Sequence, residues 1–208
     1  MKILFYGDSI TDAGRDRTDP HNLGPGYPAK IAEWLAINQL EKTFEVINRG
    51  IGGDRTNELL ERIEEDCLDE KPDLVSLLVG INDTWHNLEG KTFATAEEAH
   101  RFEVNYRSLV DQILQLGKPL IILEPYLLPH PKERLQWRVD LDPKIQIIRQ
   151  IALEHHLPFV PLDGILHSYA VDLGCQAITG EDGVHPTDLG FELITKAWLD
   201  VAIRHHLI

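Results

Sequence analysis

Short apolar runs alternate with helix-length segments along this chain. The runs that we interpret as strands are Lys2–Tyr6, Phe44–Asn48, Leu74–Val79, Pro119–Pro125 and Pro158–Pro161. The helical patterns between and after them cover Tyr27–Ala36, Thr56–Leu68, Ala96–Leu116, Pro143–His155, Leu162–Tyr169 and Thr187–His205. Helices of this length between strands are typical of right-handed crossovers that join parallel strands. The pattern therefore predicts a three-layer α/β/α sandwich around a parallel sheet of about five strands.

The size and composition of the chain predict one domain over residues 1–208. It has 208 residues, 43% of them hydrophobic, with no internal repeat or linker. Cys67 and Cys175 lie far apart in the sequence, so we interpret them as free thiols in a reducing compartment. No secretory signal pattern precedes the first strand, and no apolar run approaches a membrane span. We expect a cytoplasmic protein, unless a leader has been removed.

The charge of the chain limits its partners. The formal net charge is −14, which disfavours nucleic acids and anionic membranes, because both favour clusters of Lys and Arg. We expect neither as a partner. The same charge makes a strongly anionic substrate less natural, unless a local patch of positive charge overrides the average.

Four polar turns follow predicted strands. They are Gly7-Asp8-Ser9, Gly50-Ile51-Gly52-Gly53, Gly80-Ile81-Asn82-Asp83 and Asp182-Gly183-Val184-His185. The first three must open at the carboxyl edge of a parallel sheet, where such folds bind their ligands. The fourth follows the last strand and can reach the same edge. A serine, an imidazole, a carboxylate, a carboxamide and a glycine-rich backbone thus converge there.

This set of groups is the one that acyl transfer needs. Ser9 is a weak nucleophile unless a base such as His185 accepts its proton. Asp182, three residues earlier, can orient the imidazole through its other nitrogen. A tetrahedral oxyanion needs preorganised donors, and the candidates are the N–H groups of Ser9 and Gly53 and the amide of Asn82.

These motifs resemble the four sequence blocks of the SGNH hydrolases, also called the GDSL esterase/lipase family. The matching residues are Gly7–Ile10, Gly53, Gly80–Asp83 and Asp182–Pro186. They occur in the family's order and span nearly the whole chain. Ile10 replaces the leucine of the family's name. The resemblance implies a flavodoxin-like hydrolase fold with no metal and no organic cofactor.

The resemblance also implies residue roles. They are a nucleophile Ser9, a base His185 with its partner Asp182, and oxyanion donors Ser9, Gly53 and Asn82. The choice of Gly53 rests on the family's pattern of a small residue, glycine and Asp or Asn. Gly52 remains the alternative.

A narrower resemblance concerns the substrate. Gly7–Arg15, the following Gly24–Tyr27 and Gly80–Trp85 are similar to bacterial intracellular acetyl-xylooligosaccharide esterases of this superfamily. This implies removal of acetyl groups from short acetylated oligosaccharides, by enzymes that tend to be homo-oligomers.

Three residues near these motifs are candidate substrate contacts. Trp85 follows Asn82 and either stacks on a sugar ring or packs half-buried. Arg15 and Tyr27 either hydrogen-bond substrate hydroxyls or pair with a neighbouring aspartate, Asp12 or Asp16. The segment Tyr126–Leu141 is predicted to be a long polar loop, either a lid or an oligomer contact.

The sequence therefore predicts a serine esterase acting on small acyl esters, with acetyl groups on carbohydrate as the leading substrate. One alternative is a lysophospholipase, arylesterase or thioesterase of the same superfamily. Another is a non-catalytic module whose glycine-rich turns bind a sugar or an anion.

Overall fold

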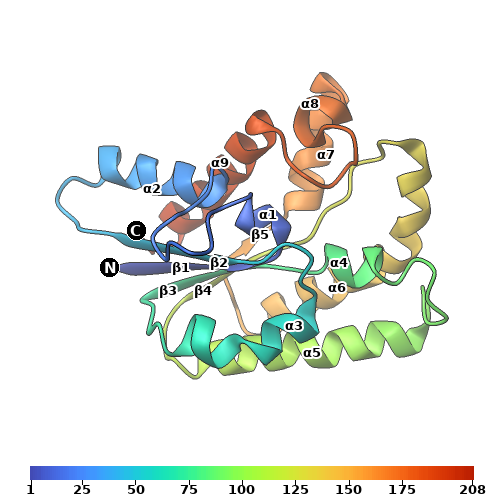
Figure 1. The fold of residues 1–208 in the computed structure, drawn as a ribbon, viewed down its shortest axis with the longest axis horizontal. Helices are drawn as coiled ribbons and strands as arrows, with labels where there is room; N and C mark the ends of the chain where they lie inside the picture. The colour runs from blue at the N-terminus through green and yellow to red at the C-terminus, as the bar shows by residue number, and fades with distance from the viewer.

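A parallel five-stranded sheet forms the centre of the computed structural model, which describes residues 1–208 (Figure 1). Its strands are Lys2–Gly7 (β1), Glu45–Gly50 (β2), Leu74–Leu78 (β3), Leu120–Leu123 (β4) and Phe159–Val160 (β5). They lie in the order β2-β1-β3-β4-β5, and every neighbouring pair is parallel. The predicted sandwich with about five parallel strands is confirmed.

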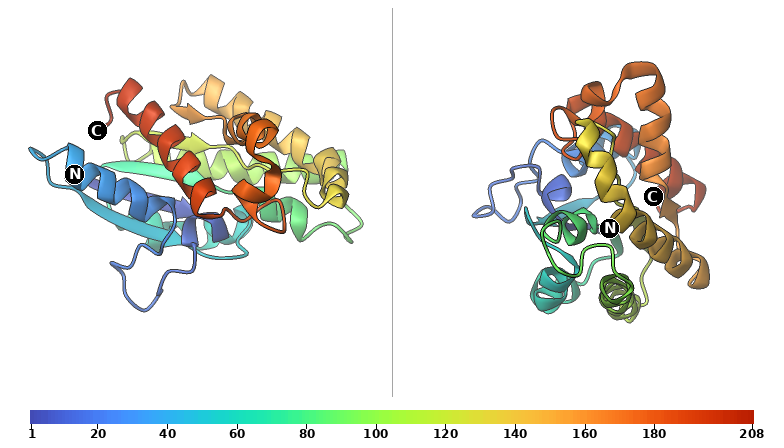
Figure 2. Two further views of the ribbon diagram at one scale, coloured as in Figure 1. Left: turned by 90° about the horizontal axis from the view of Figure 1, so that it is seen from above. Right: turned by 90° about the vertical axis from the view of Figure 1, so that its right-hand side faces the viewer.

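Helices cover both faces of this sheet (Figures 1 and 2). They are Ser9–Asp12 (α1), Tyr27–Asn38 (α2), Thr56–Glu61 (α3), Ile81–Trp85 (α4), Ala96–Leu114 (α5), Arg138–Glu154 (α6), Leu162–Leu173 (α7), Cys175–Thr179 (α8) and Asp188–Arg204 (α9). Helices α2, α7 and α9 pack on one face, and α3 and α5 on the other. No helix combines the length and apolar character needed to cross a membrane.

The first strand explains why the sheet must be covered on both sides. Ile3 and Phe5 point into the core beneath α2 and α9, whereas Leu4 and Tyr6 point into the core above α3 and α5. All four are fully buried. Successive side chains of a strand face opposite ways, so a strand that is apolar throughout needs helices on both faces.

The register of the strands brings the polar turns together. Gly7 lies opposite both Gly50 of β2 and Leu78 of β3, so the three strands end at the same level. The turns after β1, β2 and β3 therefore open at one edge of the sheet. In Figure 1 this edge carries α1 and α4.

Two of the predicted helices differ most from those in the structure. The helix predicted from Pro143 begins at Arg138, and Lys132–Trp137 forms a 3₁₀ helix, so the predicted long loop is largely structured. Pro143 is the sixth residue of α6, beyond the first four positions whose N–H groups lack an intrahelical acceptor, so the helix continues through it with one backbone hydrogen bond missing. The helix predicted over Thr56–Leu68 instead divides into α3 and a π-helical turn at Glu64–Leu68.

Candidate active site

A continuous chain of hydrogen bonds joins Ser9, His185 and Asp182. The Ser9 Oγ lies 2.9 Å from His185 Nε2, and His185 Nδ1 lies 2.6 Å from Asp182 Oδ2. Ser9 is the first residue of α1, and the other two lie in the turn before α9. The fold thus places a hydroxyl, an imidazole and a carboxylate in the order that a nucleophile, its base and an orienting acid require.

Asp182 is held by its own turn as well as by the imidazole. Its Oδ1 accepts the backbone N–H groups of Val184 and His185 at 2.9 and 2.8 Å. Burial opposes ionisation, but the hydrogen bonds from His185 and Val184 outweigh it and lower the pKa of Asp182 to about 2. The bond to Asp182 raises the pKa of His185 above its ordinary 6.5, against the effect of partial burial.

The segment after β4 fixes this turn in place. Leu128 donates its N–H to the Gly183 carbonyl at 2.9 Å, and the Tyr126 hydroxyl donates to the Val184 carbonyl at 2.8 Å. Gly183 has φ +76°, and a Cβ there would lie 2.5 Å from the Leu128 carbonyl oxygen, so the close approach requires glycine. Tyr126–Leu128 is buried, and this part of the predicted loop is a support for the site.

Three groups of the polar turns are potential oxyanion donors. The N–H of Ser9 lies in the first turn of α1, where a helix offers no acceptor. Gly53 has φ +91° and an N–H with no acceptor in the protein, whereas the Gly52 N–H is already bonded to Asp12 Oδ2 at 2.9 Å. The Asn82 Nδ2 donates one hydrogen to the backbone carbonyl of Asp54 at 3.0 Å, which leaves the second amide hydrogen of Asn82 free.

An aromatic and cationic cluster borders the histidine. The ring of Trp85 lies 5.9 Å from that of His185 and 5.1 Å from that of Trp137. The Arg134 guanidinium lies 3.9 Å from the Trp137 ring and 4.8 Å from the Trp85 ring, and its Nε donates to the Asp182 carbonyl at 3.0 Å. Trp85 thus packs against Trp137 and also borders the site at His185. Sequence reasoning did not single out Arg134, because no motif connects it with Trp85.

Tyr27 does not occupy the predicted substrate position. It is fully buried, and its hydroxyl lies 2.9 Å from the Thr11 Oγ1. Its ring packs edge-to-face on Phe5 at 5.4 Å. The prediction of a substrate contact at Tyr27 is therefore wrong, and its place in the first turn of α2, facing the core, is the reason.

Arg15 supports the loop after β2. Its Nε donates to the Gly50 carbonyl at 3.2 Å, and the side chain is only partly buried. Of the two aspartates considered as alternative partners of Arg15, Asp12 pairs with Arg17 instead. A contact between Arg15 and substrate stays a prediction.

Comparisons with known proteins agree with this geometry. The model of the GDSL-like lipase/acylhydrolase family matches residues 5–193. Over 95% of its length the chain is 33% identical to acetylxylan esterase of Geobacillus stearothermophilus, and it covers 92% of that protein. Crystal structures of catalytic mutants of this esterase, Axe2, replace a serine, an aspartate and a histidine.

Solved structures show the same fold. A GDSL-like lipase of Parabacteroides merdae ATCC 43184 has a TM-score of 0.87 at 29% identity, over 96% of this chain and 94% of that one. A variant of the acetyl-xylooligosaccharide esterase Axe2 has a TM-score of 0.85 at 33% identity, over 96% and 92% of the two chains. The chain is a carboxylic ester hydrolase that belongs to the GDSL-like lipase/acylhydrolase family.

Proposed function

We propose that Ser9, His185 and Asp182 form the catalytic triad of an acetylesterase. The observation that carries this proposal is the unbroken hydrogen-bond chain from the Ser9 hydroxyl through His185 to Asp182. The Ser9 Oγ attacks the ester carbonyl carbon while its proton passes to His185 Nε2. The ionised Asp182 stabilises the imidazolium that forms.

The two half-reactions use the same proton carrier. His185 gives its proton to the leaving alcohol as the tetrahedral intermediate collapses, which leaves an acyl-Ser9 ester. Water then attacks this ester and transfers a proton to His185 Nε2. The second tetrahedral intermediate releases the carboxylic acid, and the proton returns to Ser9 Oγ. The proposed chemistry needs no cofactor.

The oxyanion of both intermediates is proposed to bind the N–H groups of Ser9 and Gly53 and the free amide hydrogen of Asn82. Each such donor is worth roughly 3–4 kcal/mol in the transition state. The choice of Gly53 over Gly52 is supported by the acceptor that the Gly52 N–H already has in Asp12.

The proposed substrate is an acetyl ester on carbohydrate, such as an acetylated xylooligosaccharide. Its support is the 33% identity with an acetylxylan esterase over nearly the whole chain. Trp85, next to His185, offers an aromatic face on which a sugar ring can stack. A contact of the substrate with Arg15 at the loop after β2 belongs to the same proposal.

The length of the acyl group that the enzyme prefers distinguishes an acetylesterase from a lipase. We expect purified protein to release acetate from acetylated xylotriose and to hydrolyse acetyl esters faster than octanoyl esters of the same alcohol. Ser9→Ala is the control for background hydrolysis. A preference for octanoyl esters would replace the acetylesterase with a lysophospholipase or thioesterase that uses the same triad.

The remaining expectations concern organisation and location. We propose that residues 1–208 act as one catalytic domain in a homo-oligomer, and light scattering of the purified protein measures that state. A cytoplasmic location is supported by the two free cysteines, Cys67 and Cys175. Detection of this protein in the culture medium of intact source cells would contradict that location.

A further inference from the structure

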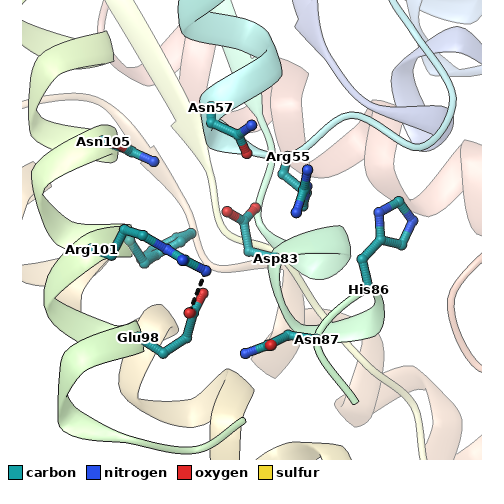
Figure 3. A pocket seen from close by; sticks show the side chains of 9 residues that line it. Arg55, Asn57, Asp83, His86, Asn87, Glu98, Arg101 and Asn105 are labelled. Atoms are coloured by element: carbon teal, nitrogen blue, oxygen red, sulfur yellow. Dashed lines mark hydrogen bonds and ion pairs between the residues drawn. The ribbon is translucent and has the colours of Figure 1, made fainter. Parts of the chain in front are cut away.

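A cavity of about 250 Å³ lies between α3, α4 and α5 (Figure 3). Its lining is polar apart from one ring, and consists of Arg55, Asn57, Asp83, His86, Asn87, Glu98, Arg101, Phe102 and Asn105. Its volume lies below the roughly 300–1,000 Å³ typical of drug-sized ligands, so it suits a fragment the size of one sugar ring.

This cavity shares a wall with the proposed oxyanion hole. Asp83 follows Asn82 directly in α4, and His86 follows the end of the same helix. The His86 Cε1 lies 3.8 Å from where a Cβ of Gly53 would be. Arg55, two residues after Gly53, lines the cavity next to Asp83 and His86 (Figure 3). A substrate bound at Ser9 therefore has this cavity as a neighbour.

Both arginines of the cavity are already paired with carboxylates. Arg55 pairs with Glu58, and Arg101 pairs with Glu98. The Asp83 carboxylate accepts hydrogen bonds from the backbone and the hydroxyl of the first residue of α3. With each arginine paired to a carboxylate, the cavity offers no surplus positive charge for an anion. A neutral ligand fits it better.

Three asparagines supply unused hydrogen-bonding capacity. The Asn87 Nδ2 is buried and has no partner. The amide nitrogens of Asn57 and Asn105 donate to Glu58 and to Thr56 Oγ1, which leaves their carbonyl oxygens without a protein donor. Figure 3 shows Asn87 and Asn105 extending into the space between α4 and α5. The cavity thus has a free donor at one end and free acceptors at the other, a set that matches hydroxyl groups, which both donate and accept.

We propose that this cavity is a subsite for a sugar ring of the substrate's alcohol portion, with Asn87 and Asn105 as its principal ligands. This inference rests on the proposed acetylesterase function. It extends that function from the ester bond to the polyhydroxylated group that carries it. An apolar acyl chain is excluded by the same lining, since burying it there would leave the carboxamides without partners.

Substrate selectivity tests the subsite. We expect Asn87→Ala and Asn105→Ala to lower the ratio of kcat/KM for acetylated xylotriose to that for phenyl acetate by about three- to tenfold, through a higher KM for the sugar. Asn38→Ala, at the exposed end of α2, is the matched control and leaves the ratio unchanged. An unchanged ratio in both cavity variants, with melting temperatures like the wild type, would overturn the proposal.

NMR of the wild-type protein tests the subsite even if one of the variants fails to fold. Unacetylated xylotriose should shift the side-chain amide NMR signals of Asn87 and Asn105 and leave that of Asn38 in place. No shift at either cavity residue would contradict the subsite. If Ser9→Ala is inactive and no shift occurs, only the subsite fails; if Ser9→Ala keeps its esterase activity, the proposed function fails.

Discussion

Asp12 accepts the backbone N–H of Gly52 at 2.9 Å across a gap of 40 residues in sequence. Asp12 closes α1, directly after the serine turn, so this bond joins the loop after β2 to the helix that carries Ser9. The loop passes so close that a Cβ on Gly52 would lie 3.7 Å from the Cβ of Ser9. Asp12 therefore fixes the amide that precedes the proposed oxyanion donor, Gly53.

We expect Asp12→Ala to lower kcat although Asp12 touches no substrate. Loss of the Asp12 carboxylate frees the Gly52 N–H and loosens the loop, so the Gly53 N–H is held less firmly in position. We expect kcat to fall by about 10–100-fold, which is less than the decrease caused by removing an oxyanion donor outright. Steady-state kinetics with phenyl acetate measures it. Asp16→Ala, on the exposed part of the same segment, is the control. A wild-type kcat in Asp12→Ala would show that the loop holds without this bond.

Asn82→Ala should reduce kcat by about 10²–10³ with little change in KM. The reason is that its second amide hydrogen is proposed to bind the oxyanion, which exists only after attack on the carbonyl. Its first amide hydrogen is bound to the Asp54 carbonyl, which orients the group. An increase in KM with unchanged kcat would instead make Asn82 a ground-state substrate contact.

The pH profile should follow His185. Its pKa is raised above 6.5 by the hydrogen bond to Asp182, and only the neutral imidazole can accept the Ser9 proton. Activity is therefore expected to be lost as pH falls through a midpoint above 6.5. Asp182→Asn removes the carboxylate charge behind the hydrogen bond that raises the pKa of His185, so the remaining activity should have a lower midpoint. A kcat/KM that is flat from pH 5 to 8 would argue against His185 as the base.

The sequence predicted the sheet and the convergence of its turns, because apolar runs and strand direction depend on local patterning. It favoured Gly53 over Gly52 only through the family's pattern, since the bond of the Gly52 N–H to Asp12 joins residues that are distant in sequence. It named Tyr27 as a candidate substrate contact because proximity along the chain does not reveal which face of α2 meets the core. The cluster of Arg134 and Trp137 was also outside its reach, because it forms only when the turn before α9 folds against them.

Asp8, next to the nucleophile, should make folding stability depend on pH. It is fully buried, its Oδ1 accepts the Ile10 N–H at 3.0 Å, and its Oδ2 has no partner. Burial raises its pKa from 3.8 to about 7. Between these values the folded chain keeps a proton that the unfolded chain has released, so this group's contribution to stability falls as pH rises.

Asp8→Asn isolates that contribution, because the amide keeps the acceptor for Ile10 and cannot ionise. We expect the melting temperature of Asp8→Asn, relative to wild type, to rise from pH 4.5 to pH 7.5. A difference that stays constant over this range would mean that Asp8 titrates alike in the folded and unfolded chains.

The central claim is that Ser9 is the nucleophile, and covalent labelling tests it most directly. A fluorophosphonate reacts with a serine only when a base activates it, and leaves a stable adduct on its oxygen. Intact-mass spectrometry of wild type should show one adduct, which peptide mapping places on Ser9, and Ser9→Ala should show none. A wild-type chain that stays unlabelled, or a Ser9→Ala chain labelled to the same extent, would contradict the account.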